Sequence, residues 1–244
     1  MAAFNAYTGV IESRLAVQHR SPNTFLAHIP ADAEASAGTR INDRLLPGQV
    51  IIERIPVPAH PGLSGAALYH WRGTAFAPGA TVAEFERLMK NFASYPRNFA
   101  PEVLSARLLG QQGDRLRATM RVRQQHVLTV VLDTDYDIDY GRLDARHGYS
   151  MARSTRIAEI ASPGTPAEHV LDASHAHGFL WRQKTYWSYE QRDGGLYMQI
   201  ESVSLTRAIP LGLGWAIGPY VESIPRDSLE FTLRAAILAL GKQR

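Results

Sequence analysis

The sequence predicts an α+β fold in which a curved antiparallel sheet packs against a long C-terminal helix. Two observations favour this class. Strand-like segments follow one another from residue 103 to residue 207 with mostly short connections, which is typical of antiparallel pairing. The chain then ends in a helix-like segment at about 226–240, closed by a glycine. A helix laid across one face of such a sheet buries the apolar side of both.

The composition of the 244 residues fits a protein with a large hydrophobic core. Hydrophobic residues make up 45% of the chain and charged residues 20%, and the net charge is +3, which excludes extensive disorder. The absence of cysteine excludes thiolate metal sites, cysteine nucleophiles and disulfides. No apolar stretch approaches 18 residues, and no Lys/Arg run exceeds two. We therefore expect neither a membrane span nor a nucleic-acid partner.

The N-terminus lacks the charged and apolar regions of a signal peptide. A cytoplasmic location agrees with this, and so does export of a chain whose signal peptide has been removed. The oligomeric state is left open.

The first 63 residues are expected to form an N-terminal extension, a helix followed by a loop, packed on a main domain of residues 64–244. Phe4, Tyr7, Ile11 and Leu15 share one helical stripe. Residues 30–65 are rich in Ala, Gly and Pro and read as a loop, apart from a short apolar run at 50–52.

The main domain is expected to open with a strand, two short helices and then further strands. Pro78-Gly79 ends the first strand, and Thr81 and Glu84 form a capping box at the start of a helix. A short second helix is expected near Tyr95. The expected sheet has six or seven strands, drawn from residues 66–77, 103–111, 115–123, 127–140, 147–160, 179–191 and 196–207.

Alternating charge indicates which face of each strand meets solvent. Arginines occupy odd positions of 115–123, and aspartates occupy odd positions 133 to 139. A three-residue loop at 124–126 would place Arg117 opposite Asp133 and Arg115 opposite Asp135 on the solvent face. The acidic run lacks the glycine and glutamate of a calcium loop, so we interpret it as a solvated strand face.

The last hairpin is expected to turn at Asp193-Gly194 or at Gly194-Gly195. Its odd positions in 179–191 are aromatic, so both Trp181 and Trp187 are expected to face the C-terminal helix. The even positions, Lys184 and Tyr186 among them, are expected on the exposed face, with Glu201 near these two residues.

The order of these elements resembles the START-like (SRPBCC) superfamily, whose helix-grip fold includes polyketide cyclases, aromatases and lipid-transfer proteins. The motifs that carry the resemblance are the Pro78-Gly79 turn with its Thr81 helix, the segment Phe92-Ala-Ser-Tyr95-Pro96, and the helix from Pro225. The resemblance covers about 66–244, and the segment from Phe179 to Trp215 looks similar to uncharacterised bacterial members.

Members of this superfamily often hold a cavity between sheet and helix, so the resemblance implies a pocket on the aromatic, hydroxyl-bearing inner face. A solid core is the alternative. The candidate ligand-binding residues are Met120, Tyr136, Trp181, Thr185, Trp187, Tyr189, Met198, Ile200, Ser202, Ser204, Leu229 and Leu233.

The first functional hypothesis is binding or transport of a hydrophobic or aromatic small molecule or lipid. The alternatives are a cyclase or aromatase acting on a polyketide-like substrate, and a non-catalytic interaction domain. No acid/base pair is recognisable, so no catalytic residue is assigned. No cofactor or metal is expected. His169, His175 and His177 lie in or near one loop, and the pair two residues apart could bind zinc, but no carboxylate or third ligand has a recognisable spacing.

Three further features carry alternative interpretations. The glycine-rich stretch 212–218, with Leu213, Trp215 and Ile217, is either a packed connector or a cover over the cavity. Arg153 and Glu159 lie either on the surface or in an ion pair at the cavity. His70 and His147 are expected to be hydrogen-bonded structural residues.

Overall fold

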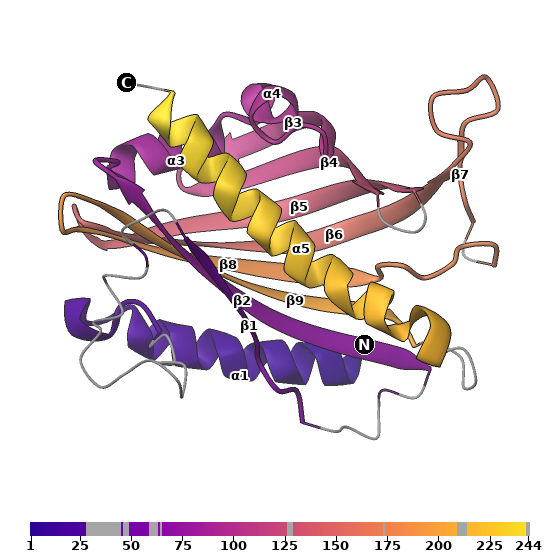
Figure 1. Ribbon diagram of the computed structural model, residues 1–244, viewed down its shortest axis with the longest axis horizontal. Helices are drawn as coiled ribbons and strands as arrows, with labels where there is room; N and C mark the ends of the chain where they lie inside the picture. Colours follow the sequence, from indigo (N-terminus) through magenta and orange to yellow (C-terminus); the bar gives the residue numbers. More distant parts are fainter. Residues whose placement is uncertain are drawn as a thin grey trace.

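The computed structural model describes residues 1–27, 45, 49–58, 63, 65–125, 129–172, 174–208 and 214–242, without the side chains of 214–223. A nine-stranded antiparallel sheet forms its centre (Figure 1). The strand order is β1-β2-β9-β8-β6-β5-β4-β3, and β7 pairs with β6. The strands are β1 (Val50–Arg54), β2 (Ala66–Pro78), β3 (Val103–Gln112), β4 (Arg115–Gln125), β5 (Thr129–Asp144), β6 (His147–Ala161), β7 (His169–Val170), β8 (Arg182–Arg192) and β9 (Gly195–Arg207). The predicted α+β class and antiparallel sheet are confirmed, and β1 and β7 extend the sheet beyond the six or seven strands expected.

Helices cover both faces of the sheet (Figure 1). They are α1 (Ala2–Gln18), α3 (Val82–Lys90), α4 (Tyr95–Asn98) and α5 (Gly214–Gly241), with 3-10 turns η1 (Pro22–Thr24) and η3 (Phe92–Ser94). We call the face under α5 the inner face and the face under α1 the outer face. The capping box is confirmed, since the Thr81 side chain accepts from the Glu84 N–H and the Glu84 carboxylate accepts from the Thr81 N–H.

The helix α5 begins twelve residues earlier than its predicted start at 226. Glycine and proline lower helix propensity, and on that basis the sequence predicts an irregular segment over 210–226. Packing of the same helix along β1, β2 and α3 outweighs that local preference.

The hairpin of β4 and β5 keeps the predicted faces but not the predicted register. Arg117 lies opposite Asp137 rather than Asp133, and Arg115 lies opposite Asp139. Gln125 pairs with Thr129, so the three-residue connection comes two residues later than expected and lies outside the described residues. Odd positions still face odd positions. The acidic run is therefore a strand face matched to arginines, with Arg121 Nε 2.7 Å from Asp133 Oδ1.

The hairpin of β8 and β9 turns at Asp193-Gly194, both with positive φ, the first of the two turns predicted. Its outer face was predicted to be exposed, and this prediction is wrong because α1 covers that face. The cluster of Phe4, Ile11 and Leu15 from α1 packs on Tyr186, Val203 and Leu205. Lys184 is only 18% exposed, and its Nζ lies 2.7 Å from Glu12 Oε1 of α1. The predicted proximity of Glu201 to Tyr186 is confirmed, since the two are directly opposed.

The packing of α1 predicts a contrast between two neighbouring residues of that helix. Ile11 is 5% exposed in the outer-face cluster, whereas Val10 is 70% exposed. Ile11→Ala should lower the free energy of unfolding by about 2–5 kcal/mol through lost burial and the cavity left behind. Val10→Ala should change it by no more than about 0.5 kcal/mol. Urea unfolding followed by circular dichroism measures both, and equal effects would mean that α1 is not part of the cooperative fold.

Candidate functional site

The inner face is closed along the half of the sheet that faces the C-terminal part of α5. Six of the predicted ligand-binding residues lie here in one core cluster and are no more than 5% exposed: Trp187, Tyr189, Met198, Ile200, Leu229 and Leu233. They pack with Phe85 and Leu88 of α3. This half is solid core, as the alternative interpretation had it.

The next residues along the same strands form a polar half. Thr185 lies opposite Ser202 on β9, and Ser202 lies opposite Trp71 on β2. One step further, Gln183 lies opposite Ser204. Because side chains two apart share a face, these residues continue the face of Trp187 and Ile200 toward α5. The inner face of β8 thus changes from the apolar Trp187 to the hydroxyl of Thr185 and the amide of Gln183.

Hydrogen bonds hold the polar half in place. The Tyr136 hydroxyl donates to Gln183 Oε1 over 2.9 Å, and Gln183 Nε2 donates to Ser202 Oγ over 3.3 Å. Burial raises the pKa of Tyr136 to about 12, so its hydroxyl keeps the proton that it donates. Apolar groups border this network, since Met120 packs against a second inner-face cluster that contains Tyr136.

The two halves differ in how completely they are buried. Thr185 and Gln183 are half-buried, whereas Trp187 and Tyr189 beyond them on β8 are buried. The structure thus brings Tyr136, Thr185, Ser202 and Ser204 of the predicted set together in the polar half. There Thr185 and Gln183 of β8 are half-buried, whereas Tyr136, Ser202 and Ser204 are buried.

Trp181 does not join this group. It precedes the first residue of β8, so the alternation used to orient it does not extend that far. Its indole packs against the outer-face cluster that contains Tyr186 and Leu205. The expectation that both Trp181 and Trp187 face α5 is therefore wrong for Trp181.

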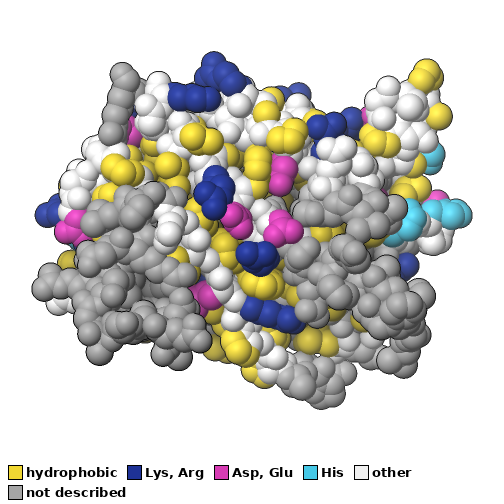
Figure 2. Space-filling view, viewed as in Figure 1, with side chains coloured by type: hydrophobic (Ala, Val, Ile, Leu, Met, Phe, Trp, Pro, Cys, Tyr) yellow, Lys and Arg dark blue, Asp and Glu magenta, His cyan; other side chains and the backbone are white. Residues whose placement is uncertain are grey.

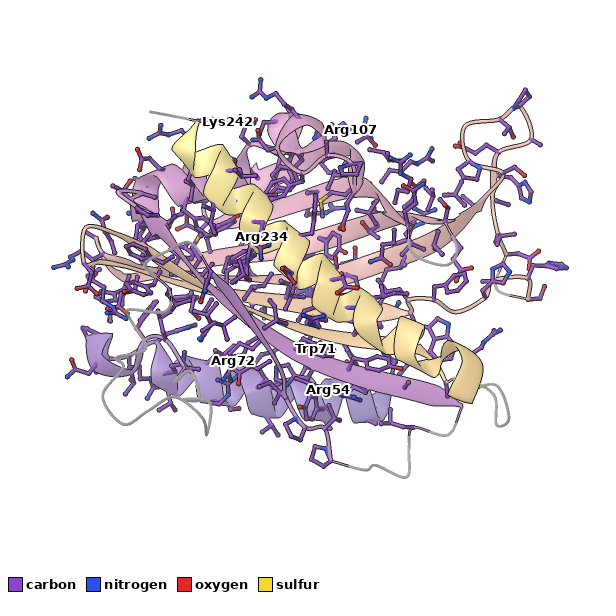
Figure 3. All side chains as sticks on the ribbon, in the orientation of Figure 1. Arg54, Trp71, Arg72, Arg107, Arg234 and Lys242 are labelled. Atoms are coloured by element: carbon purple, nitrogen blue, oxygen red, sulfur yellow. The ribbon has the colours of Figure 1, made fainter. Side chains whose placement is uncertain are left out.

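Sequence reasoning missed two inner-face residues. Gln183 has the odd position that the strand pattern assigns to the inner face, and its amide could have been recognised as a polar group among aromatic ones. Trp71 lies on β2 beside α5 (Figure 3). Its strand was predicted, but its face depends on the pairing of Trp71 with Ser202, which joins residues far apart in the sequence.

The carboxyl group of Glu102, which lies beside Ser228 of α5, has a raised pKa. Burial raises the pKa of Glu102 to about 7, and the nearby Asp227 adds to the shift. The Ser228 hydroxyl of α5 lies 3.5 Å from its Oε2 and opposes the shift. A carboxyl group with a pKa near neutrality can both release and accept a proton.

A buried ionic network occupies the outer face under α1. Glu201 is 3% exposed, and its Oε2 lies 2.6 Å from Arg14 Nη2 of α1 and 2.9 Å from His70 Nε2. Its Oε1 lies 3.2 Å from Arg72 Nε. The Tyr7 hydroxyl of α1 bonds His70 Nδ1 over 2.9 Å. Burial alone would raise the pKa of Glu201, but the His70 hydrogen bond and the two arginines hold it at about 2.

The histidines have structural partners. His70 lies in the network of Glu201, and His147 bonds Asp144, as expected for hydrogen-bonded structural residues. Histidine side chains at the edge of the molecule lie beside the β7 loop (Figure 2). There His175 bonds Asp172 and His177 bonds Glu159.

The surface interpretation is right for Arg153 and wrong for Glu159, and the two residues bond different partners. Arg153 is exposed and bonds Asp137, whereas Glu159 is buried and accepts hydrogen bonds from the backbone N–H groups of residues 177–179. Of the glycine-rich stretch, Leu213 and the side chains of Trp215 and Ile217 lie outside the described residues. The described helices include none with the length and apolarity needed to cross a bilayer.

The comparison with known proteins shows the fold. No family model and no curated protein matches this sequence. The protein TTHA0849 from Thermus thermophilus superposes with a TM-score of 0.50 at 13% identity, over 70% of this chain and 97% of that one. The Zhui aromatase/cyclase from Streptomyces sp. R1128 superposes with a TM-score of 0.49 at 10% identity, over 72% of this chain and 96% of that one. A STAR-related lipid transfer protein from Xanthomonas axonopodis superposes with a TM-score of 0.45 at 16% identity, over 76% of this chain and 98% of that one. This likeness shows the fold alone: the structure has a helix-grip fold, as the sequence motifs predicted.

The Glu201 network predicts an acid-dependent stability. The folded pKa of about 2 lies below the ordinary value of 4.5, so the ionised carboxylate stabilises the fold fully above about pH 5 and loses this effect as the pH falls toward 2. Glu201→Gln should therefore destabilise the protein by about 3 kcal/mol at pH 7, and the difference from wild type should shrink between pH 5 and 2. Urea unfolding across this range measures it. Glu230→Gln, which removes an ion pair on the exposed side of α5, is the control and should give a small, nearly constant difference.

Glu102 predicts the opposite trend. Its folded pKa of about 7 lies above 4.5, so the folded state holds the proton more tightly and loses stability as the pH rises from 4.5 through 7. Glu102→Gln removes the buried carboxylate and should become more stable than wild type across this interval, by on the order of 1 kcal/mol after screening by solvent. Thermal unfolding at pH 4.5 and pH 8 makes the comparison, and a difference that does not change with pH would contradict the shifted pKa.

Proposed function

We propose that the protein binds an uncharged, largely apolar small molecule between the polar half of the inner face and α5. The observation that carries this proposal is the change in burial along β8, from buried Trp187 and Tyr189 to half-buried Thr185 and Gln183. A strand whose inner side is closed at one end and less covered at the other offers a site of limited length. A few fixed polar groups in an apolar surround are typical of small-molecule sites.

The side chains support an uncharged ligand. Thr185, Gln183, Ser202 and Ser204 of the polar half carry hydroxyl or amide groups, and the nearby tyrosine keeps its proton. Arg54 of β1, opposite Trp71, shares this face but is exposed and lies over the Tyr69 ring. Lys184 of β8 and Glu201 of β9 lie on the outer face and pair with α1. A charged ligand would lose its hydration without gaining an opposite charge from these inner-face groups.

A second candidate function is acid–base catalysis on such a ligand, of the cyclase or aromatase type. The observation that favours it is Glu102, whose pKa of about 7 suits proton transfer near neutral pH. In an assay of cyclisation, loss of turnover in Glu102→Gln with unchanged ligand binding would support the enzyme over the binding protein.

A blocking substitution tests the proposed site. Thr185→Phe places a ring in the less covered part of the inner face, and we expect it to weaken binding of the apolar dye Nile red at least tenfold by occupying the ligand's space. Thr155→Phe adds the same ring at an exposed position of β6 and should leave binding unchanged. Fluorescence titration gives both dissociation constants, and circular dichroism shows that both variants are folded.

Native mass spectrometry of freshly purified protein complements this test by weighing any ligand that remains bound. If wild type binds no dye and carries no ligand, or if Thr185→Phe binds as wild type does, the inner face is not the site.

A further inference from the structure

Among the described residues, the indole nitrogen of Trp71 is the one buried side-chain nitrogen or oxygen atom without a hydrogen-bond partner. More than about nine in ten buried polar groups in proteins have a partner, because an unpaired donor loses its hydration and gains nothing in return. An indole N–H can only donate. The atom therefore points to a missing acceptor.

The position of Trp71 places this donor at the proposed ligand site. Gly73, two residues further along β2, faces Leu233 of α5, and Trp71 shares its face. Trp71 also packs partly buried against the core cluster under α5 and lies directly opposite Ser202. Figure 3 shows it on β2 beside the helix.

The hydrogen bonds of the polar half leave this donor unused. The Tyr136 hydroxyl donates to Gln183, and the Gln183 amide donates to Ser202, so these donors are engaged within the protein. Trp71 is not part of that chain of hydrogen bonds. It is a buried donor that the folded protein leaves unpaired on the face of Thr185 and Ser202.

We propose that Trp71 donates a hydrogen bond to a neutral carbonyl oxygen of the bound molecule, such as that of a ketone or an ester. A neutral acceptor is favoured over a carboxylate because the buried and half-buried groups on this face, Thr185, Ser202 and Gln183, carry no positive charge. Arg54 of β1 lies opposite Trp71 on the same face, but it is exposed and its guanidinium lies over the Tyr69 ring. This assignment rests on the proposed function and specifies the ligand: an apolar skeleton with at least one carbonyl group.

A matched pair of probes tests the assignment. Prodan, a naphthalene that bears a propionyl ketone, is compared with the analogue in which a propyl group replaces the propionyl group. Wild type should bind the ketone about tenfold more tightly than the alkyl analogue. Trp71→Phe keeps an aromatic ring and removes the N–H, so it should lose about tenfold for the ketone and leave the affinity for the alkyl analogue unchanged.

Trp181→Phe is the control, because it removes an indole that packs on the outer-face side. It should bind both probes as wild type does. If Trp71→Phe does not fold, the wild-type protein labelled with 15N gives a second measurement: the Trp71 indole N–H signal should move downfield with the ketone and not with the alkyl analogue.

The outcomes separate this inference from the proposed function. Binding of both probes with equal affinity, unchanged by Trp71→Phe and without a downfield shift, overturns the carbonyl assignment and leaves the apolar site standing. Binding of neither probe overturns both.

Discussion

Burial of β8 and β9 on both faces is the constraint on which the rest of the structure depends. Every residue of β9 from Gly195 to Thr206 is buried, which an antiparallel strand with one solvated face does not show. The inner side lies under α5 and the outer side under α1. Polar side chains on these strands must therefore find partners within the protein or in a ligand, since water is excluded from both sides.

The two faces meet this requirement differently. On the outer face the carboxylate of Glu201 has three charged or ring partners, two from the sheet and one from α1, and Lys184 is paired with Glu12 of that helix. Removing α1 would take Arg14 from Glu201 and Glu12 from Lys184 and would uncover the apolar cluster beneath the helix, so α1 is an integral cover for the sheet. On the inner face, Tyr136, Gln183 and Ser202 bond one another, and among the described residues the buried indole nitrogen of Trp71 has no partner. The two faces thus differ: Glu201 and Lys184 of the outer face are paired, whereas the inner face holds an unpaired donor.

The sequence was sufficient for the order of the strands and for most of their faces, because alternating arginine and aspartate repeat every second residue and leave one orientation for each strand. It was insufficient wherever a partner lies far along the chain. Lys184 and Glu201 have the composition of a solvated face, and only the docking of α1 turns them into buried ion pairs. The register of β4 and β5 moved by four residues because the connection between them shifted by two, which the charge pattern does not detect.

The same distinction holds for the candidate site. The aromatic residues of β8 and β9 identified the inner face correctly, but aromaticity does not distinguish a filled core from a binding surface. What distinguishes them is the helix above. Leu233, Ala236 and Leu240 of α5 follow a helical spacing and are buried against the closed half, where small and apolar side chains allow close approach. Near the middle of the helix, Ser228 and Thr232 bring hydroxyl groups to partly buried positions, and the Ser228 hydroxyl lies beside the Glu102 carboxyl group. The C-terminal half of α5 therefore fixes the helix to the sheet. A ligand bound as we propose, beside Trp71, Thr185 and Ser202, would leave this core cluster in place, so the proposed site conflicts little with stability.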